Sequence, residues 1–273
     1  MHLPFLDRSP RVALVRLHGV ISARPGGLGP ASLSLASLAP VLDRAFAMKR
    51  LSAVFLAINS PGGSAVQSAL IAGRIRALAE EKRLPVIACV EDAAASGGYW
   101  LACAADEIVA EPTSILGSIG VIAAGFGFTE ALEKLGVERR VRTAGTEKSF
   151  WDPFRPERPE DAERLHALLD DLHEEFRAWI RGRRGAKLTA PEGDLFTGRF
   201  WAGRRAVELG LADRLGADPV AEAKRRFGER VKVIPVGARR PPIWRRLLLP
   251  PGLSAEGAIA ALEERAAWAR LGL

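Results

Sequence analysis

Ser96 and its neighbours carry the clearest chemical signal in this chain. The serine lies within VEDAAASGGYW at residues 90–100, after an apolar run and ahead of two glycines. A serine between a strand and a helix lies beside the N–H groups of the helix N-terminus, which can stabilise an oxyanion. The pattern fits a nucleophile for acyl transfer, and it fits equally a serine that only caps a tightly packed helix.

A second glycine-rich loop, NSPGGS at residues 59–64, follows the strand-like run at 53–58. In a parallel sheet, the loops that follow the strands line one edge, and ligands bind at that edge. Gly62 or Gly63 could therefore offer a second oxyanion donor, although proline and glycine also shape ordinary turns. Two such loops in one chain favour a binding edge over two unrelated turns.

A serine nucleophile needs a base, and the histidines do not supply an obvious one. They occur at the N-terminus, in a predicted strand and in a long predicted helix, as His2, His18, His166 and His173. The last two share a helix face, but surface histidines explain their spacing more simply than a metal pair does. We therefore predict no metal or other cofactor, and a lysine is the remaining candidate for the base.

The elements that position these loops alternate between strand and helix. Runs rich in Val, Ile and Leu predict buried strands at residues 12–21, 53–58 and 85–90, with helical patterns at 35–48 and 65–81 between them. Such alternation implies parallel strands joined by right-handed crossovers, because a tight turn cannot link a parallel pair. The predicted fold class is α/β.

The second half of the chain predicts a long helix at residues 159–184, whose apolar stripe could pack on its own sheet or between protomers. Two shorter helices and a strand are predicted to follow at residues 202–209, 218–227 and 231–236. We expect one domain over residues 1–236. Residues 237–273 should form a basic linker rich in Pro, Arg and Leu and a final amphipathic helix.

Length and composition describe a globular protein with a basic surface. The 273 residues are 48% hydrophobic and 26% charged, with a formal net charge of +7. No zinc-finger, helix-turn-helix or aromatic RNA-binding pattern accompanies the arginines, so nucleic acid is not a predicted partner. Cys89 and Cys103 lie in apolar runs and are predicted to be core thiols.

No apolar run reaches the length of a signal-peptide core or of a membrane span, so we expect a location in the cytoplasm or at a membrane periphery. Residues 243–249, IWRRLLL, combine basic and apolar side chains. This combination suits either contact with anionic lipid or a grip on a neighbouring protomer.

Four ordered motifs resemble the signal peptide peptidase A family, a group of Ser/Lys peptidases. They are INSPGG at residues 58–63, ASGGYW at 95–100, LGSIGVI at 116–122 and FTGRFWAGRRAVELGLADRLG at 196–216. The resemblance covers roughly residues 12–216. It implies a ClpP/crotonase-like α/β fold of ββα and βαβ repeats with a parallel sheet, followed here by a helical, basic C-terminal tail.

The resemblance also implies the roles of the site residues. Ser96 would be the nucleophile, and Lys148, three residues after Gly145, would be the base. The remaining implied residues are the oxyanion donors Gly63 and Gly97, Ser118, which would hydrogen-bond the lysine, and Asn59 at the border of the pocket.

Lys148 has to be neutral to accept a proton, so its pKa must fall from about 10.4 toward neutrality. Desolvation is the usual cause of such a fall, and we therefore expect this lysine to be buried when the enzyme is active. Glu147 departs from the family pattern and should point away from the amine. Because family members take the lysine from a neighbouring protomer or repeat, a single copy of the fold implies a ring-like homo-oligomer.

The predicted activity is hydrolysis of extended, apolar peptides, such as signal-peptide remnants, through an acyl-enzyme on Ser96. One alternative is a crotonase-type enzyme acting on acyl-CoA, with Glu91 or Asp92 as its base. A second is a catalytically silent scaffold for membrane proteins. The presence of both Ser96 and Lys148 argues against both alternatives.

Overall fold

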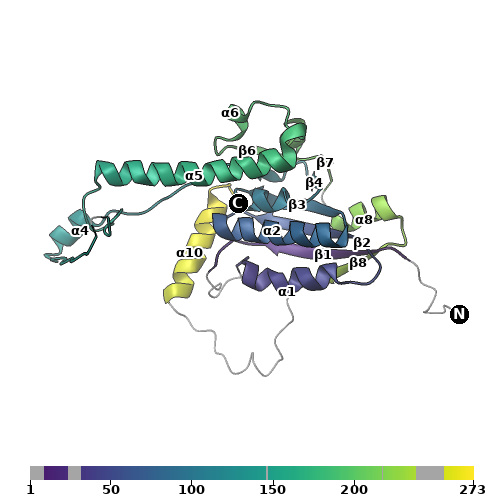
Figure 1. Ribbon diagram of the computed structural model, residues 1–273, viewed down its shortest axis with the longest axis horizontal. Coiled ribbons are helices and arrows are strands. Elements are labelled where there is room, and N and C mark those ends of the chain that lie inside the picture. The colour runs from purple at the N-terminus through teal and green to yellow at the C-terminus, as the bar shows by residue number, and fades with distance from the viewer. Residues whose placement is uncertain (1–8, 24–31, 146, 217, 238–254) are drawn as a thin grey trace, which may run out of the picture.

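A largely parallel sheet forms the centre of the protein in a computed structural model, which describes residues 9–23, 32–145, 147–216, 218–237 and 255–273 (Figure 1). Within these residues the sheet has eight strands, and its main path is β6-β5-β3-β2-β1-β8. The long strands are β1 (Arg11–His18), β2 (Leu51–Ser60), β3 (Val86–Ala95) and β8 (Lys232–Val236). Their parallel pairing confirms the predicted α/β class.

Four short strands complete the sheet, and none of them was predicted from the sequence. They are β4 (Glu107–Ala110), β5 (Ile115–Gly117), β6 (Phe200–Ala202) and β7 (Arg214–Leu215). β3 pairs with β4 along its first half and with β5 along its second half. β6 pairs antiparallel with β5, which departs from the parallel arrangement of the other strands.

Side chains of β2 alternate between two hydrophobic clusters, as the period of two in a strand requires. Val54, Leu56 and Ile58 face a large cluster shared with α1 (Leu35–Phe46), α2 (Ala65–Lys82) and α3 (Gly97–Ala102). The intervening residues face a smaller cluster that includes Ala223 of α8 (Pro219–Phe227). Helices therefore cover both faces of the sheet, and the ranges of α1 and α2 agree with the predicted helices.

The predicted long helix is α5 (Pro159–Arg184), and its two halves lie in different surroundings. Phe176 and Ile180 near its C-terminal end are buried in the large cluster. Its N-terminal half projects away from the sheet and carries α4 (Thr129–Lys134) near its tip (Figure 1). We call residues 121–172 the arm and the other described residues the body; Leu168 of the arm is 50% exposed.

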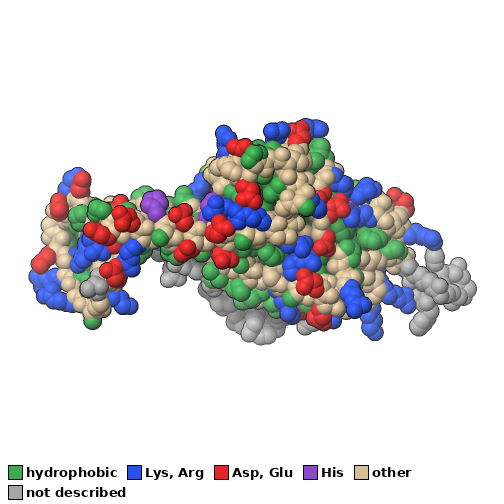
Figure 2. Space-filling view, turned by 45° about the horizontal axis from the view of Figure 1, so that its top comes forward, with side chains coloured by type: hydrophobic (Ala, Val, Ile, Leu, Met, Phe, Trp, Pro, Cys, Tyr) green, Lys and Arg blue, Asp and Glu red, His purple; other side chains and the backbone are tan. Residues whose placement is uncertain are grey.

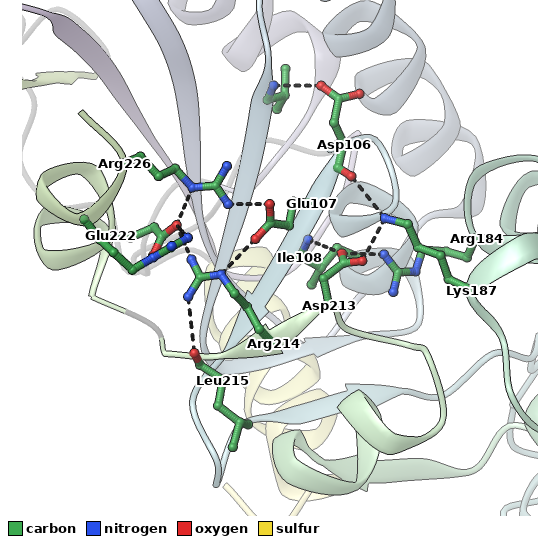
Figure 3. Close-up of polar contacts among 12 residues, drawn as sticks. Asp106, Glu107, Ile108, Arg184, Lys187, Asp213, Arg214, Leu215, Glu222 and Arg226 are labelled. Carbon is green, nitrogen blue, oxygen red and sulfur yellow. Dashed lines mark hydrogen bonds and ion pairs between the residues drawn. The ribbon is translucent and has the colours of Figure 1, made fainter. Parts of the chain in front are cut away.

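Two charged clusters fasten helices to the sheet (Figure 3). Asp213 accepts hydrogen bonds from the buried Arg184 at the end of α5, from Lys187 and from the Ile108 N–H. Burial alone would raise the pKa of Asp213, but these hydrogen bonds lower it below its ordinary value. This cluster fixes the C-terminal end of α5 to the body.

The second cluster attaches α8 to the sheet. Glu222 of α8 is 5% exposed and pairs with Arg214, Arg225 and Arg226. Burial alone would raise the pKa of Glu222, but the three guanidinium groups lower it to about 2. Arg214 and Arg226 also bind Glu107 at the start of β4, so the cluster spans helix and sheet (Figure 3).

The rest of the chain consists of short elements and a C-terminal helix. They are η2 (Gly185–Lys187), α6 (Glu192–Leu195), α7 (Gly203–Glu208) and α10 (Ala255–Ala269). Among the described residues, no helix combines the length and apolar character needed to cross a membrane. The predicted contact segment at 243–249 lies outside the described residues.

Candidate active site

Ser96 occupies the sharp turn between β3 and α3, where its backbone is strained. Its φ is 51° and its ψ is −121°, a combination that L-residues rarely adopt. The Ser96 N–H donates to the Gly117 carbonyl at 2.8 Å, and its carbonyl accepts from the Tyr99 and Trp100 N–H groups. These bonds hold the half-buried serine at the carboxyl edge of the sheet. An observed outlier of this kind is typical of functional sites.

The two glycine-rich loops touch each other at this turn. A Cβ placed on Gly62 would lie 2.8 Å from the Ser96 Cβ, so only glycine allows the loops to approach this closely. The Gly62 N–H donates to Ser60 Oγ at 3.2 Å. By contrast, the Gly63 and Gly97 N–H groups have no acceptor among the described residues, and a Cβ on Gly97 would lie 3.4 Å from the Gly63 nitrogen. Gly63 and Gly97 thus offer two free donors beside Ser96.

Ile21 holds the Gly63 loop in place, and sequence reasoning missed this residue. The Ile21 N–H donates to the Gly62 carbonyl, and the Ser64 N–H donates to the Ile21 carbonyl, both at 2.8 Å. Gly63 has a φ of +136°, and a Cβ there would lie 2.1 Å from the Ile21 oxygen. The order of β1 beside β2 creates this contact. That order was not available from the sequence.

Asn59 and Ser118 flank the turn in different ways. The Asn59 amide donates to Asp92 and accepts from the Ala93 N–H at 3.2 Å, so it ties the end of β2 to β3. Ser118, with a φ of 53°, follows directly after Gly117, whose carbonyl accepts from Ser96. The structure therefore brings both serines and the glycine loops to one edge, with the Asn59 side chain bound to the adjacent strand.

Lys148 lies away from this edge, on the arm, where it is exposed. The preceding Glu147 pairs with Arg164 on the N-terminal half of α5. Arg164 comes twelve residues before Phe176, the first deeply buried residue toward the body, and this separation is about 18 Å along a helix. The structure does not bring Lys148 to Ser96 of the same chain, and no hydrogen bond joins the Ser96 hydroxyl to another described lysine or histidine.

The comparison with known families supplies the deciding observation. Residues 78–233 match the model of "Peptidase family S49", and this match covers more than half of the chain and includes Ser96, Gly97, Ser118 and Lys148. The chain belongs to peptidase family S49. The match confirms the resemblance to signal peptide peptidase A that the sequence motifs indicated.

Individual relatives of this S49 chain carry different names. It is 47% identical over 277 residues to "Na(+)/H(+) antiporter NhaA" of Brucella melitensis, across 96% of this chain and 37% of that protein. It is 34% identical over 238 residues to "Serine protease SPPA, chloroplastic" of Arabidopsis thaliana, across 85% of this chain and 35% of that protein. It is 33% identical over 170 residues to "Putative signal peptide peptidase SppA" of Enterococcus faecium, across 62% of this chain and 48% of that protein. The S49 chain spans less than half the length of these three relatives.

Two thiols and one phenol in the body are inert as nucleophiles. Burial raises the pKa of the Cys89 thiol and of the Cys103 thiol to about 12, so both stay protonated at neutral pH. Burial also raises the pKa of Tyr99, whose hydroxyl donates to the Leu211 carbonyl at 2.8 Å. The cysteines are core thiols, as predicted, and Ser96 has no competitor among these three groups.

Proposed function

We propose that this chain is a serine peptidase subunit in which Ser96 attacks a peptide carbonyl. The observation that carries this proposal is the strained serine beside two unengaged N–H donors, those of Gly63 and Gly97. These donors can stabilise the negative oxygen that forms when the serine oxygen bonds to the carbonyl carbon. The C–N bond then breaks, and the amine leaves with the proton that the base took from Ser96. Water hydrolyses the resulting ester and frees the serine.

We propose Lys148 of a neighbouring protomer as the base, within a ring-like homo-oligomer. Its exposed position on the arm supports this arrangement, because an arm that projects from one protomer can reach the site of the next. Exposed apolar side chains on the same arm also support it, since Phe126, Leu135 and Ile122 are 82%, 75% and 69% exposed. Figure 2 shows hydrophobic side chains among the charged ones on the arm. Contact with a neighbour would remove this surface and the Lys148 amine from water.

We propose extended, apolar peptides as substrates, including signal-peptide remnants. Val66 and Leu70 lie on one face of the first turns of α2, immediately after the Gly63 loop, and are 61% and 45% exposed. Apolar side chains at this position suit an apolar peptide near the oxyanion donors. The name of the Enterococcus faecium relative agrees with this substrate class.

The acyl-CoA alternative has less support, because its carboxylate bases are engaged. Asp92 accepts a hydrogen bond from Asn59, and Glu91 lies 3.0 Å from His18 Nε2. Asp92 therefore joins β3 to the neighbouring β2, and Glu91 contacts β1 on the far side of β2. Peripheral membrane contact through residues 243–249 remains part of the proposal, and liposome co-sedimentation with and without residues 237–273 tests it.

The first experiment compares hydrolysis of an apolar fluorogenic peptide by wild type, Ser96→Ala and Lys148→Ala, with assembly checked by size-exclusion chromatography. Both variants should assemble and lose turnover. Lys134→Ala is the matched control, because Lys134 is also an exposed lysine of the arm. Full activity of Lys148→Ala would place the base elsewhere.

Mixing the two inactive variants tests whether the lysine acts across protomers. After the oligomers are dissociated and reassembled together, some sites should combine the intact serine of one variant with the intact lysine of the other. With random assembly of a ring, about a quarter of the sites should be active. A mixture that stays inactive while it assembles would contradict a lysine supplied in trans.

A further inference from the structure

The helix that begins at the nucleophile is too short to fix its own position. α3 runs from Gly97 to Ala102, directly after Ser96, and all six of its residues are buried. A helix of this length makes very few internal hydrogen bonds, so its surroundings must determine where it lies. The strained backbone of Ser96 also persists only when neighbouring contacts hold it.

Side chains of α5 hold the far end of α3. The Trp179 Nε1–H donates to the Trp100 carbonyl at 3.0 Å. Arg183 donates through Nε to the Cys103 carbonyl and through Nη2 to the Ala105 carbonyl, both at 2.9 Å. Carbonyls at a helix C-terminus lack partners within the helix, and here a single guanidinium satisfies two of them at the end of α3 and in the turn that follows. Its positive charge is also favourable at this end of a helix.

A second arginine, on α2, binds the turn that follows α3. Arg76 of α2 donates through Nη1 to the Ala104 carbonyl at 3.3 Å and to Asp106 Oδ1 at 2.8 Å. Arg183 Nη2 lies 3.3 Å from the same Asp106 oxygen. The other oxygen of Asp106 accepts from the Val86 N–H at 2.9 Å, at the start of β3. The end of α3 is thereby joined to α2, to α5 and to the beginning of the strand that leads to Ser96.

We propose that Arg183 is a positioning residue for Ser96, which it serves by fixing the C-terminal end of α3. This inference rests on the proposed peptidase function. The planar guanidinium of Arg183 binds two carbonyls and a carboxylate together, which a lysine amine cannot reproduce. Loss of Arg183 lets α3 shift along its axis, and that shift displaces the Ser96 hydroxyl and the Gly97 N–H in concert.

The same helix links both halves of the proposed site. The N-terminal half of α5 belongs to the arm, and Arg183 lies at the C-terminal end of the same helix (Figure 1). Arg181, two residues before Arg183, provides a natural contrast: it binds Glu174 and Glu192 and makes no hydrogen bond to α3. The two arginines therefore have similar numbers of partners but different connections to the nucleophile.

The test measures kcat and KM of the assembled wild type, Arg183→Met, Arg183→Lys and the control Arg181→Met, together with labelling of Ser96 by a serine-reactive fluorophosphonate. Arg183→Met should lower kcat and the labelling rate roughly 10- to 100-fold, since small displacements of reacting groups have effects of this size. KM should stay within about twofold, because the substrate contacts remain. Arg183→Lys should fall between wild type and Arg183→Met.

Thermal unfolding and size-exclusion chromatography of the same variants test for a purely structural effect, which would lower the unfolding temperature or disturb assembly. Arg183→Met with wild-type kcat would overturn the positioning role, and so would an equal loss of kcat in Arg181→Met. Absence of turnover and of Ser96 labelling in wild type would instead refute the peptidase function itself. The two failures are therefore distinguishable.

Discussion

The body and the arm differ in how completely each satisfies its own side chains. In the body, the large hydrophobic cluster buries aliphatic and aromatic residues from both helices and strands, and charged groups such as Glu222 are enclosed by partners. In the arm, Phe126 and Leu135 remain mostly exposed. The body holds Ser96 and the two glycine donors, whereas the arm holds Lys148. The part that carries the proposed nucleophile is complete by itself, and the part that carries the proposed base is not.

The largest expected difference between body and arm concerns their phenylalanines. Phe176 is 2% exposed and stacks on Trp100 with ring centroids 4.7 Å apart, so Phe176→Ala should lower the free energy of unfolding by about 4 to 5 kcal/mol. Phe126→Ala should change it by less than about 0.5 kcal/mol, because the ring is mostly exposed. Urea denaturation measures both values. A large loss for Phe126→Ala in dissociated protomers would contradict the comparison.

Two glycines with positive φ give the next contrast. A Cβ at Gly210 of the body would lie 1.8 Å from the Lys187 oxygen, whereas a Cβ at Gly136 of the arm would meet nothing within 4 Å. Gly210→Ala should therefore cost about 3 to 4 kcal/mol of stability, through overpacking and a strained φ. Gly136→Ala should cost only about 1 kcal/mol, from the φ alone. Thermal unfolding of both variants checks this order, and equal losses would show that the arm is packed as tightly as the body.

The smallest expected effect is a pH dependence that arises in the body. Glu222 has a folded pKa of about 2, below the ordinary value of 4.5, so its ionised form stabilises the native state. This contribution is about 2 kcal/mol, because solvent screens the partly exposed arginine partners; it is present above about pH 5 and is lost as the pH falls toward 2. Glu222→Gln should flatten the dependence of unfolding free energy on pH between 5 and 2. Glu138→Gln, in an exposed pair with Arg140 on the arm, should change that dependence much less, because solvent screens an exposed ion pair.

Much of the body could be predicted from sequence because its strands are continuous apolar runs and its helices show helical spacing. β2 is buried on both faces, and α2 places Ile71, Ile75 and Leu78 on one face. The glycine-rich loops follow directly after such strands. The short strand β5 could not be predicted, because three residues are too few to show a period. Its pairing with β3 nevertheless places Gly117 against Ser96.

Contacts between distant segments were also beyond the reach of sequence reasoning. Ile21 reaches the Gly63 loop only because β1 and β2 are neighbours in the sheet. Arg183 meets the end of α3 only because α5 crosses it eighty residues later in the chain. The two possible roles of the long helix could not be separated either, because its apolar stripe continues from the packed half into the projecting half.

The positive φ of Ser96 sets the proposed catalytic role of this residue against the stability of the fold. Holding a serine at this φ and ψ costs about 1 to 3 kcal/mol, a cost that glycine would avoid. Replacement of Ser96 by glycine would thus give a firmer fold without a nucleophile. Selection for stability alone would therefore favour glycine at this position, and a strained serine is expected here only if it performs a reaction, as proposed for Ser96.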